Sequence, residues 1–206
     1  MTSTPRSYDP IQDGQDLLNA VYLWHQDAFN ENLCKKLIAR GADLSMTDKG
    51  GHTALITASI RGHTGVVEAL LDKGADIEAQ AQNESTPLIL AIMNKKTDTA
   101  KILLRHGANI HARNCYGSTP LICAAENGNA EITRLLLHMG ANLDDTDKSL
   151  HTASAHAKRR RYSNIIDMIQ KESERRITRQ FRTAAEKGTV RARKIKRPQT
   201  THGKTP

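Results

Sequence analysis

Apolar residues along the chain form short helical stripes separated by polar turns. Leu88, Ala91 and Ile92 recur at the spacing of one helix face, and the pair Leu103-Leu104 belongs to a second stripe in the same stretch. A polar loop follows each pair of stripes. No apolar run approaches the roughly 20 residues that a membrane-spanning helix needs. The pattern predicts an all-α chain of helix–turn–helix units whose connecting loops project as fingers.

Three sequence marks repeat with one period. The triplet Gly-Ala-Asp/Asn recurs every 33 residues, beginning at Gly41, Gly74, Gly107 and Gly140. The element Thr-Ala/Pro-Leu keeps the same spacing, beginning at Thr53, Thr86, Thr119 and, as a weaker Thr-Ala, Thr152. An apolar pair precedes each glycine of the triplets. Because a single unit of this kind cannot bury its apolar faces alone, the repetition predicts a stacked solenoid.

Each mark has a physical role in a helix pair. The hydroxyl of Thr86 can accept a hydrogen bond from an N–H group at the start of the first helix, and Pro87 suits the first helical turn. Gly62 and Gly128 break the pattern between the two helices of a unit. The second helix is expected to end at a glycine such as Gly107, which enters the left-handed conformation without a Cβ penalty.

The residues at these marks resemble those of the ankyrin repeat. Its T-P-L-H-x-A signature matches Thr86-Pro87-Leu88 and Thr119-Pro120-Leu121, and the resemblance covers about residues 16–170. The histidine of the signature is replaced here by an isoleucine, at Ile56, Ile89 and Ile122. This replacement removes the hydrogen bonds that the resemblance implies for that histidine and adds apolar contact between repeats. Since burial of an isoleucine contributes roughly 1.5–3 kcal/mol, we expect the fold to survive.

The register of the marks predicts an ankyrin-repeat domain over residues 16–172. Its five units are expected at about residues 16–43, 44–76, 77–109, 110–142 and 143–172. The first is a divergent cap that starts at Asp16 and includes Trp24, and the fifth lacks its terminal glycine because Ser173 stands there. We expect a disordered segment over 1–15, a basic helical extension over 173–187, in a helix running from about Ser163 to Lys187, and a disordered basic tail over 188–206.

The resemblance also implies where a partner would bind. In ankyrin proteins the finger tips and the exposed face of the first helix form a concave contact surface. The matching positions in this chain are Lys49, His52, Arg61, Gln82, Asn83, Met93, Asn94, Tyr116, Glu126, Asn127, Arg159 and Arg160. Met93 and Tyr116 are expected to be the apolar anchors, because exposed aromatic and flexible apolar groups dominate binding hot spots. A protein partner is therefore expected, and its identity stays open.

Charge divides the chain into two parts. The formal net charge is +8, but residues 1–157 carry 14 Lys/Arg against 18 Asp/Glu, whereas residues 158–206 carry 16 against 4. The basic C-terminal part is expected to add an electrostatic contact through Arg175, Arg176, Arg179, Arg191, Arg193, Lys194, Lys196 and Arg197. Nucleic-acid phosphate, an anionic membrane surface, an acidic partner and a merely solubilising role remain open for it.

The sequence shows no pattern typical of an enzyme, a cofactor or a metal site. The motifs G-x-S-x-G, G-x-x-x-x-G-K-S/T, G-x-G-x-x-G and H-E-x-x-H are all missing, and the nine histidines are scattered. The group Asp144-Asp145-Asp147 is interpreted as a solvated finger loop or a helix cap, since it lacks the spacing of a calcium loop. Three unpatterned cysteines argue against a disulfide framework. We expect a non-catalytic monomer in the cytoplasm, with a nuclear or secreted-effector location as open alternatives.

Overall fold

The structure is a computed structural model that describes residues 9–22 and 30–195, with side chains described as far as residue 183. The expected cap residue Trp24 lies outside these ranges. The described residues form helices and no strands. The helices are α1 (Pro10–Tyr22), α2 (Glu31–Ala39), α3 (Ala54–Arg61), α4 (Thr64–Asp72), α5 (Pro87–Met93), α6 (Thr97–Arg105), α7 (Pro120–Glu126), α8 (Ala130–His138), α9 (Ala153–Arg160) and α10 (Ser163–Ile195).

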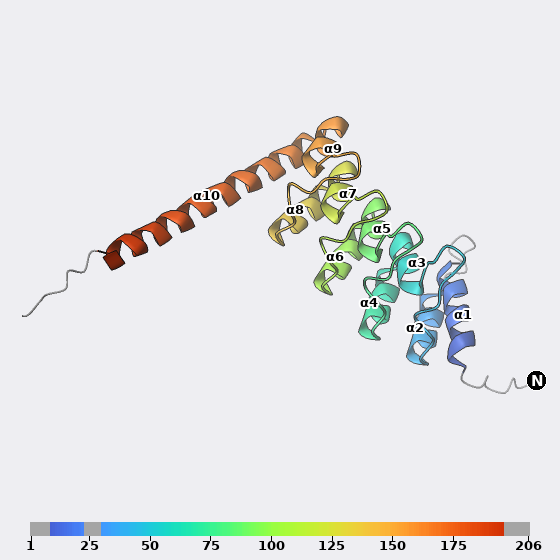
Figure 1. Cartoon of the computed structure of the whole chain (residues 1–206). Helices are drawn as coiled ribbons and strands as arrows, with labels where there is room; N and C mark the ends of the chain where they lie inside the picture. The colour runs from blue at the N-terminus through green and yellow to red at the C-terminus, as the bar shows by residue number, and fades with distance from the viewer. Residues whose placement is uncertain (1–8, 23–29, 196–206) are drawn as a thin grey trace, which may run out of the picture.

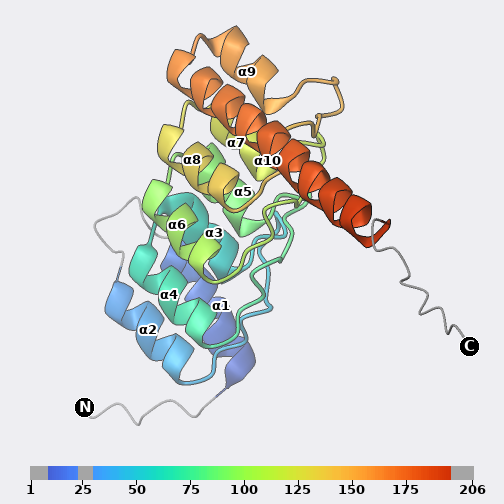
Figure 2. The ribbon, with the colours of Figure 1, turned by 90° about the vertical axis from the view of Figure 1, so that its left-hand side faces the viewer.

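The helices stack in two layers, as Figure 1 shows. The odd-numbered helices α1 to α9 pack in sequence against one another, and so do the even-numbered helices α2 to α8, followed by α10. Each consecutive pair makes one repeat, from repeat one (α1 and α2) to repeat five (α9 and the start of α10). The long loops between repeats lie together on one side of the stack (Figure 2). The predicted all-α solenoid of five helix pairs with finger loops is confirmed for the described residues.

Threonine caps begin the first helix of repeats two to five. The hydroxyl oxygens of Thr53, Thr86, Thr119 and Thr152 accept the backbone N–H of the residue three positions later, at 3.2–3.4 Å. Pro87 and Pro120 occupy the first helical turn beside their threonines. Each cap satisfies an N–H group that the helix itself leaves unpaired and contributes about 1 kcal/mol.

The isoleucines that replace the signature histidine are buried. Ile56, Ile89 and Ile122 are at most 1% exposed, so they add the apolar contact that the sequence predicts. One large cluster of buried apolar side chains runs through all repeats from Leu17 to Ile169. The core is therefore a continuous layer between helix pairs.

Three backbone positions in each of repeats two to four adopt the left-handed conformation, and two of them recur in repeat five. The second helices of repeats one to four end at positive φ, at Gly41, Gly74, Gly107 and Gly140. The finger turns and the turns between paired helices repeat the same conformation. The finger positions are Gly51, Glu84, Gly117 and Leu150, and the inter-helix positions are Gly62, Lys95, Gly128 and Arg161. Glycine fits this conformation without strain, whereas the four other residues adopt it at a cost.

Neighbouring fingers are joined by a backbone hydrogen bond that recurs along the stack. The N–H groups of Gln82, Cys115 and Lys148 donate to the carbonyl oxygens of Gly50, Asn83 and Tyr116 in the preceding finger, at 3.4, 2.9 and 2.9 Å. These bonds fix the register of each finger against the previous one.

The N-terminal boundary predicted from the sequence is wrong. Residues 10–15 were expected to be disordered but form the first turns of α1. The Asp9 carboxylate caps this helix by accepting the N–H groups of Ile11 and Gln12 at 3.0 and 3.2 Å. Asp13 is buried at 2% exposure, and its carboxylate lies 3.1 Å from the Arg40 guanidinium. Capping and this ion pair with α2 explain why the helix begins earlier than its apolar stripe.

The C-terminal boundary also differs from its prediction. Residues 188–195 were expected to be disordered, yet α10 continues through them to Ile195 and extends away from the stack (Figure 1). Gly188 costs a helix about 1 kcal/mol, which its alanine, arginine and lysine neighbours offset through their high helix propensity. The predicted helix over residues 163–187 lies within α10. The predicted disorder over 196–206 and 1–8 lies outside the described residues.

We predict opposite effects of glycine exchange at the repeated finger turn. Leu150 is 81% exposed with φ 61°, so Leu150→Gly relieves strain, loses little burial and should raise the free energy of unfolding by about 0.5–1 kcal/mol. Gly51→Ala introduces backbone strain at φ 73° and should lower the free energy of unfolding by about 1 kcal/mol. Urea denaturation monitored by circular dichroism measures both, and effects of the same sign would contradict this account.

His63 gives the stack a predicted pH dependence. It precedes α4 and is 6% exposed. Burial, helped by the positive charges of Arg61 and Lys96, lowers the pKa of its imidazole to about 4 although Glu31 opposes the shift. In the unfolded chain the His63 imidazole therefore takes up a proton near its ordinary pKa of 6.5, whereas in the folded chain it does so only near pH 4. The contribution of neutral His63 to the free energy of unfolding is fully present above pH 6.5. It is lost as the pH falls toward about 4, by about 3 kcal/mol in total.

The variant His63→Asn should remove this component. Asn129 is its counterpart in repeat four, where the side chain accepts the N–H of Ile132 at 3.0 Å as a helix cap. Unfolding free energies of both proteins are measured at about pH 7 and about pH 4.5, so that all other titrating groups cancel. Wild type should lose about 2–3 kcal/mol more than the variant between these pH values. Equal losses would show that His63 is not responsible.

Candidate partner-binding surface

The first helices of repeats three to five and the fingers of repeats four and five line an open hollow of about 520 Å³. It brings together half of the residues predicted to contact a partner, namely Met93, Tyr116, Glu126, Asn127, Arg159 and Arg160. Its floor includes Cys123 and His156, which are buried. Because the first helices place these residues in a row while the fingers project beside them, residues from three repeats share one surface.

The other six predicted residues lie outside this hollow, in repeats two and three, and are Lys49, His52, Arg61, Gln82, Asn83 and Asn94. None is buried, but several are engaged within the stack. The Gln82 side-chain amide donates to the Lys49 carbonyl oxygen at 2.9 Å, which links two fingers. The Arg61 guanidinium lies 5.6 Å from the centre of the Tyr22 ring, within range of a cation–π contact.

Met93 and Tyr116 are the exposed apolar side chains of the hollow. Met93 is 41% exposed and Tyr116 is 64% exposed. Tyr116 stands in the finger of repeat four, where its backbone carbonyl holds the next finger through Lys148 and its side chain is left to solvent. A flexible thioether and a rigid aromatic ring thus face a possible ligand from adjacent repeats.

The wall of the hollow in repeats four and five is charged. The carboxylate of Glu126 lies 3.3 Å from the guanidinium nitrogens of both Arg159 and Arg160. Arg159 also lies 3.2 Å from Nδ1 of His156. These pairs are partly exposed, so their contribution to stability is small, below about 1 kcal/mol each. Their effect is to hold two arginines and one carboxylate at fixed places beside the apolar anchors.

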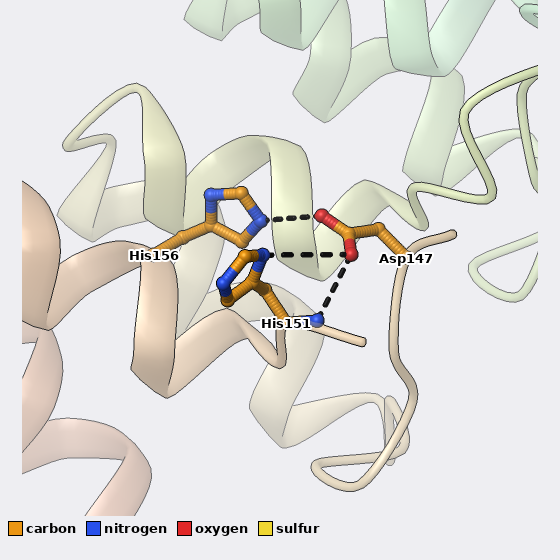
Figure 3. A group of neighbouring side chains, drawn as sticks. All are labelled: Asp147, His151 and His156. Carbon is orange, nitrogen blue, oxygen red and sulfur yellow. Dashed lines mark hydrogen bonds and ion pairs between the residues drawn. The ribbon is translucent and has the colours of Figure 1, made fainter. Parts of the chain in front are cut away.

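A histidine–aspartate cluster that the sequence analysis missed lies at the edge of this hollow (Figure 3). One oxygen of Asp147 accepts the backbone N–H groups of Ser149 and His151, both at 2.9 Å, and its other oxygen lies 2.8 Å from Nε2 of His156. Nδ1 of His151 is 3.9 Å from the first oxygen. Burial disfavours the charge of Asp147, but the hydrogen bonds from His151, His156 and Ser149 outweigh it and keep its pKa below the usual range.

The signal for this cluster was the spacing Asp-x3-His-x4-His in repeat five. It matches no common metal motif, since two of the residues lie in a finger and the third, His156, lies on α9. The sequence analysis interpreted Asp144, Asp145 and Asp147 as a solvated finger loop or a helix cap, and all three lie in the finger between α8 and α9. The carboxylate of Asp145 pairs with Arg113 at 2.6 Å and so joins neighbouring fingers.

Two of the three thiols are inert at neutral pH. Burial raises the pKa of Cys123, on the floor of the hollow, to about 12 and that of Cys34 to about 11. Both side chains act as small apolar residues in the core. A thiolate nucleophile at the hollow is therefore not available from Cys123.

The predicted electrostatic residues of the C-terminal part differ in their placement. Arg175 and Arg179 are exposed on α10. Arg176 has a different role in the structure from the predicted electrostatic contact. Its guanidinium donates to the carbonyl oxygens of Ala141 and Leu137 at 2.9 and 3.2 Å, and so holds α10 against the end of α8. The side chains of Arg191, Arg193 and Lys194, and all of Lys196 and Arg197, lie outside the described residues.

Comparison with known proteins agrees with the architecture. Within the described residues, none of the helices combines the length and the apolar character needed to cross a membrane. A family model for three copies of the ankyrin repeat matches residues 20–114, and a single-repeat ankyrin model matches residues 116–148. No curated protein matches the chain. Since these matches cover more than half of the chain and the same repeats are seen in the fold, the chain belongs to the ankyrin-repeat family.

Proposed function

We propose that this protein is a non-catalytic adaptor that binds a partner protein through the hollow of repeats three to five. Ankyrin repeats generally mediate protein–protein interactions, which supports a protein partner. The observation that carries the choice of surface is that Met93 and Tyr116, from adjacent repeats, are both exposed and both line one hollow. The remaining predicted positions of repeats two and three would extend the same contact.

The composition of the hollow suits a partner segment with an apolar side chain flanked by charge. Burial of an exposed aromatic ring and a methionine supplies the apolar contact, and interface energy concentrates in such residues. Arg159 and Arg160 line the same hollow and share Glu126 as a counter-charge. A carboxylate of the partner could therefore pair with one guanidinium while Glu126 keeps the other.

A second candidate function rests on α10. Lys171, Arg175, Arg179 and Arg182 line one side of this helix around a shallow hollow, together with Glu174 and Thr178. Basic residues repeated along one helix face attract phosphate groups without reading sequence. The alternative is a nucleic-acid-associated adaptor in which the repeats hold the partner and α10 contacts the backbone of a nucleic acid.

The first test compares a pair of exposed residues in the hollow with one exposed residue on α10. Three baits are used in a native lysate, each with and without nuclease treatment. They are the full-length protein, the variant Met93→Ala/Tyr116→Ala and the control Phe181→Ala. Phe181 is 73% exposed on α10, so it is an exposed aromatic residue like Tyr116 but lies outside the hollow. Proteins retained by wild type and by Phe181→Ala should be lost from the double variant, with a rise in Kd of about 30-fold or more for the purified partner.

The same experiment separates the two candidates. Retention that is equal in all three baits would contradict the hollow as the binding surface. Retention that disappears with nuclease, and that falls in the variant Arg175→Gln/Arg179→Gln/Arg182→Gln, would favour the nucleic-acid alternative. In that case affinity should also fall steeply with salt concentration.

A further inference from the structure

We propose that Asp147, His151 and His156 form a binding site for a divalent transition-metal ion such as Zn²⁺. One carboxylate and two imidazoles are a donor set used by zinc, and their ligand atoms all lie within 4.8 Å of one another in this structure (Figure 3). Harder ions such as Mg²⁺ and Ca²⁺ prefer all-oxygen ligands, so the two nitrogen donors favour a transition metal. The inference does not rest on the proposed partner, although the three residues line the same hollow.

Comparison between repeats shows what is special about repeat five. The finger positions of Asp147 and His151 are occupied in repeat two by Asp48 and His52, whose carboxylate and Nδ1 lie 3.3 Å apart. The position of His156 is occupied there by Thr57. Equivalent sets in the other repeats are Ala81, Ser85 and Leu90 in repeat three, and Asn114, Ser118 and Cys123 in repeat four. Within the described residues, only repeat five brings three ligands together.

The two protein ligands that are least exposed are already held in place. Asp147 is fixed by the backbone N–H groups of Ser149 and His151, which both donate to Oδ1 and leave Oδ2 facing Nε2 of His156. The side chains of Asp147 and His156 are 10% and 6% exposed. A preorganised pair of this kind loses little conformational freedom when an ion binds.

Metal binding would exchange an ion for a proton in the Asp147–His156 contact. Arg159 donates toward Nδ1 of His156, so in the metal-free protein the proton of the neutral imidazole lies on Nε2 and points to Asp147. Zn²⁺ would bind the lone pair of Nε2 in the other tautomer, in which the proton has moved to Nδ1 through solvent, so the imidazole stays neutral and no proton is released on balance. Ligand atoms about 2.0 Å from a tetrahedral ion lie about 3.3 Å apart, so the 2.8 Å contact must open by roughly half an ångström.

A carboxylate is in place to support the metal-bound tautomer. Oε1 of Glu126 lies 3.8 Å from Nδ1 of His156, and Nδ1 would carry the proton once Nε2 binds the ion. Metal-binding histidines usually donate their second N–H to such a group. Arg159 would give up its contact with Nδ1 and keep its ion pair with Glu126, which its 57% exposed side chain can do by rotation.

His151 completes the site from the solvent side. Its side chain is 48% exposed, and its ring meets that of His156 edge to face at 5.6 Å between centroids. Rotation of this ring brings a nitrogen to the ion without moving the finger. With three protein ligands the fourth position opens to the hollow, where water completes the shell. The nearby arginines repel a cation, so we expect affinity in the micromolar range rather than that of a structural zinc finger.

The test measures Zn²⁺ binding to the full-length, tag-free chain by isothermal titration calorimetry. The variant Asp147→Asn/His151→Ser copies the residues of repeat four, where Asn114 accepts the N–H groups of Tyr116 and Ser118 in the same turn, so the finger should fold. The matched control Asp48→Asn/His52→Ser makes the same changes in repeat two. Wild type and control should bind one ion equally, whereas the repeat-five variant should bind more than about 10-fold more weakly.

A second measurement keeps the proposal testable if that variant fails to fold. Co²⁺ added to wild type should give the intense visible absorption of a four-coordinate site, and Zn²⁺ should displace it. The variant His156→Thr, which places the residue of repeat two on α9, should abolish this absorption. Equal Zn²⁺ binding by both double variants, or no four-coordinate Co²⁺ spectrum with wild type, would overturn the proposal.

Discussion

Every element of this structure depends on apolar contact between neighbouring repeats. The first helices are only 7 or 8 residues long in repeats two to five, well below the length at which an isolated helix is stable in water. Each survives because side chains such as Leu88, Ile89 and Ile92 are fully buried between it and the helices on either side. The outermost repeats have only one neighbour. This explains why buried Asp13 of α1 pairs with Arg40 at the end of α2, and why Arg176 fastens α10 to α8.

Apolar contact between repeats requires every repeat to have the same register, and the backbone fixes this register. In repeats two to four, three left-handed positions reverse the chain at the same places each time, whether or not the residue is a glycine. The finger-to-finger hydrogen bonds then set each loop against the previous one. The strain at Glu84, Lys95, Leu150 and Arg161 shows that packing between repeats imposes this geometry even where the local sequence resists it.

The features that could be predicted from the sequence are those that recur. Repeated Thr caps and terminal glycines located the helix pairs, and the resemblance they carry located the concave side. The ends were harder, because Asp9 and Asp13 stabilise α1 through contacts that no period marks. Arg176 counted as a tail charge in the sequence although its partners are carbonyl groups 35 and 39 residues earlier. His156 seemed an ordinary histidine, because its neighbour Asp147 belongs to a finger and the pair forms only when the finger folds back onto α9.

The division of labour between backbone and side chain explains how such a stack acquires function. At the finger position of Gly50, Asn83 and Tyr116 the carbonyl oxygen makes the same hydrogen bond in each repeat, whatever the side chain. The side chain there takes no part in this bond, so glycine, asparagine and tyrosine all keep it. The same holds one helix turn into α9, where the position filled by Thr57 in repeat two carries His156. Stability thus resides in what the repeats share, and binding chemistry resides in the positions where one repeat departs from the others, which are the positions assigned here to a partner and to a metal ion.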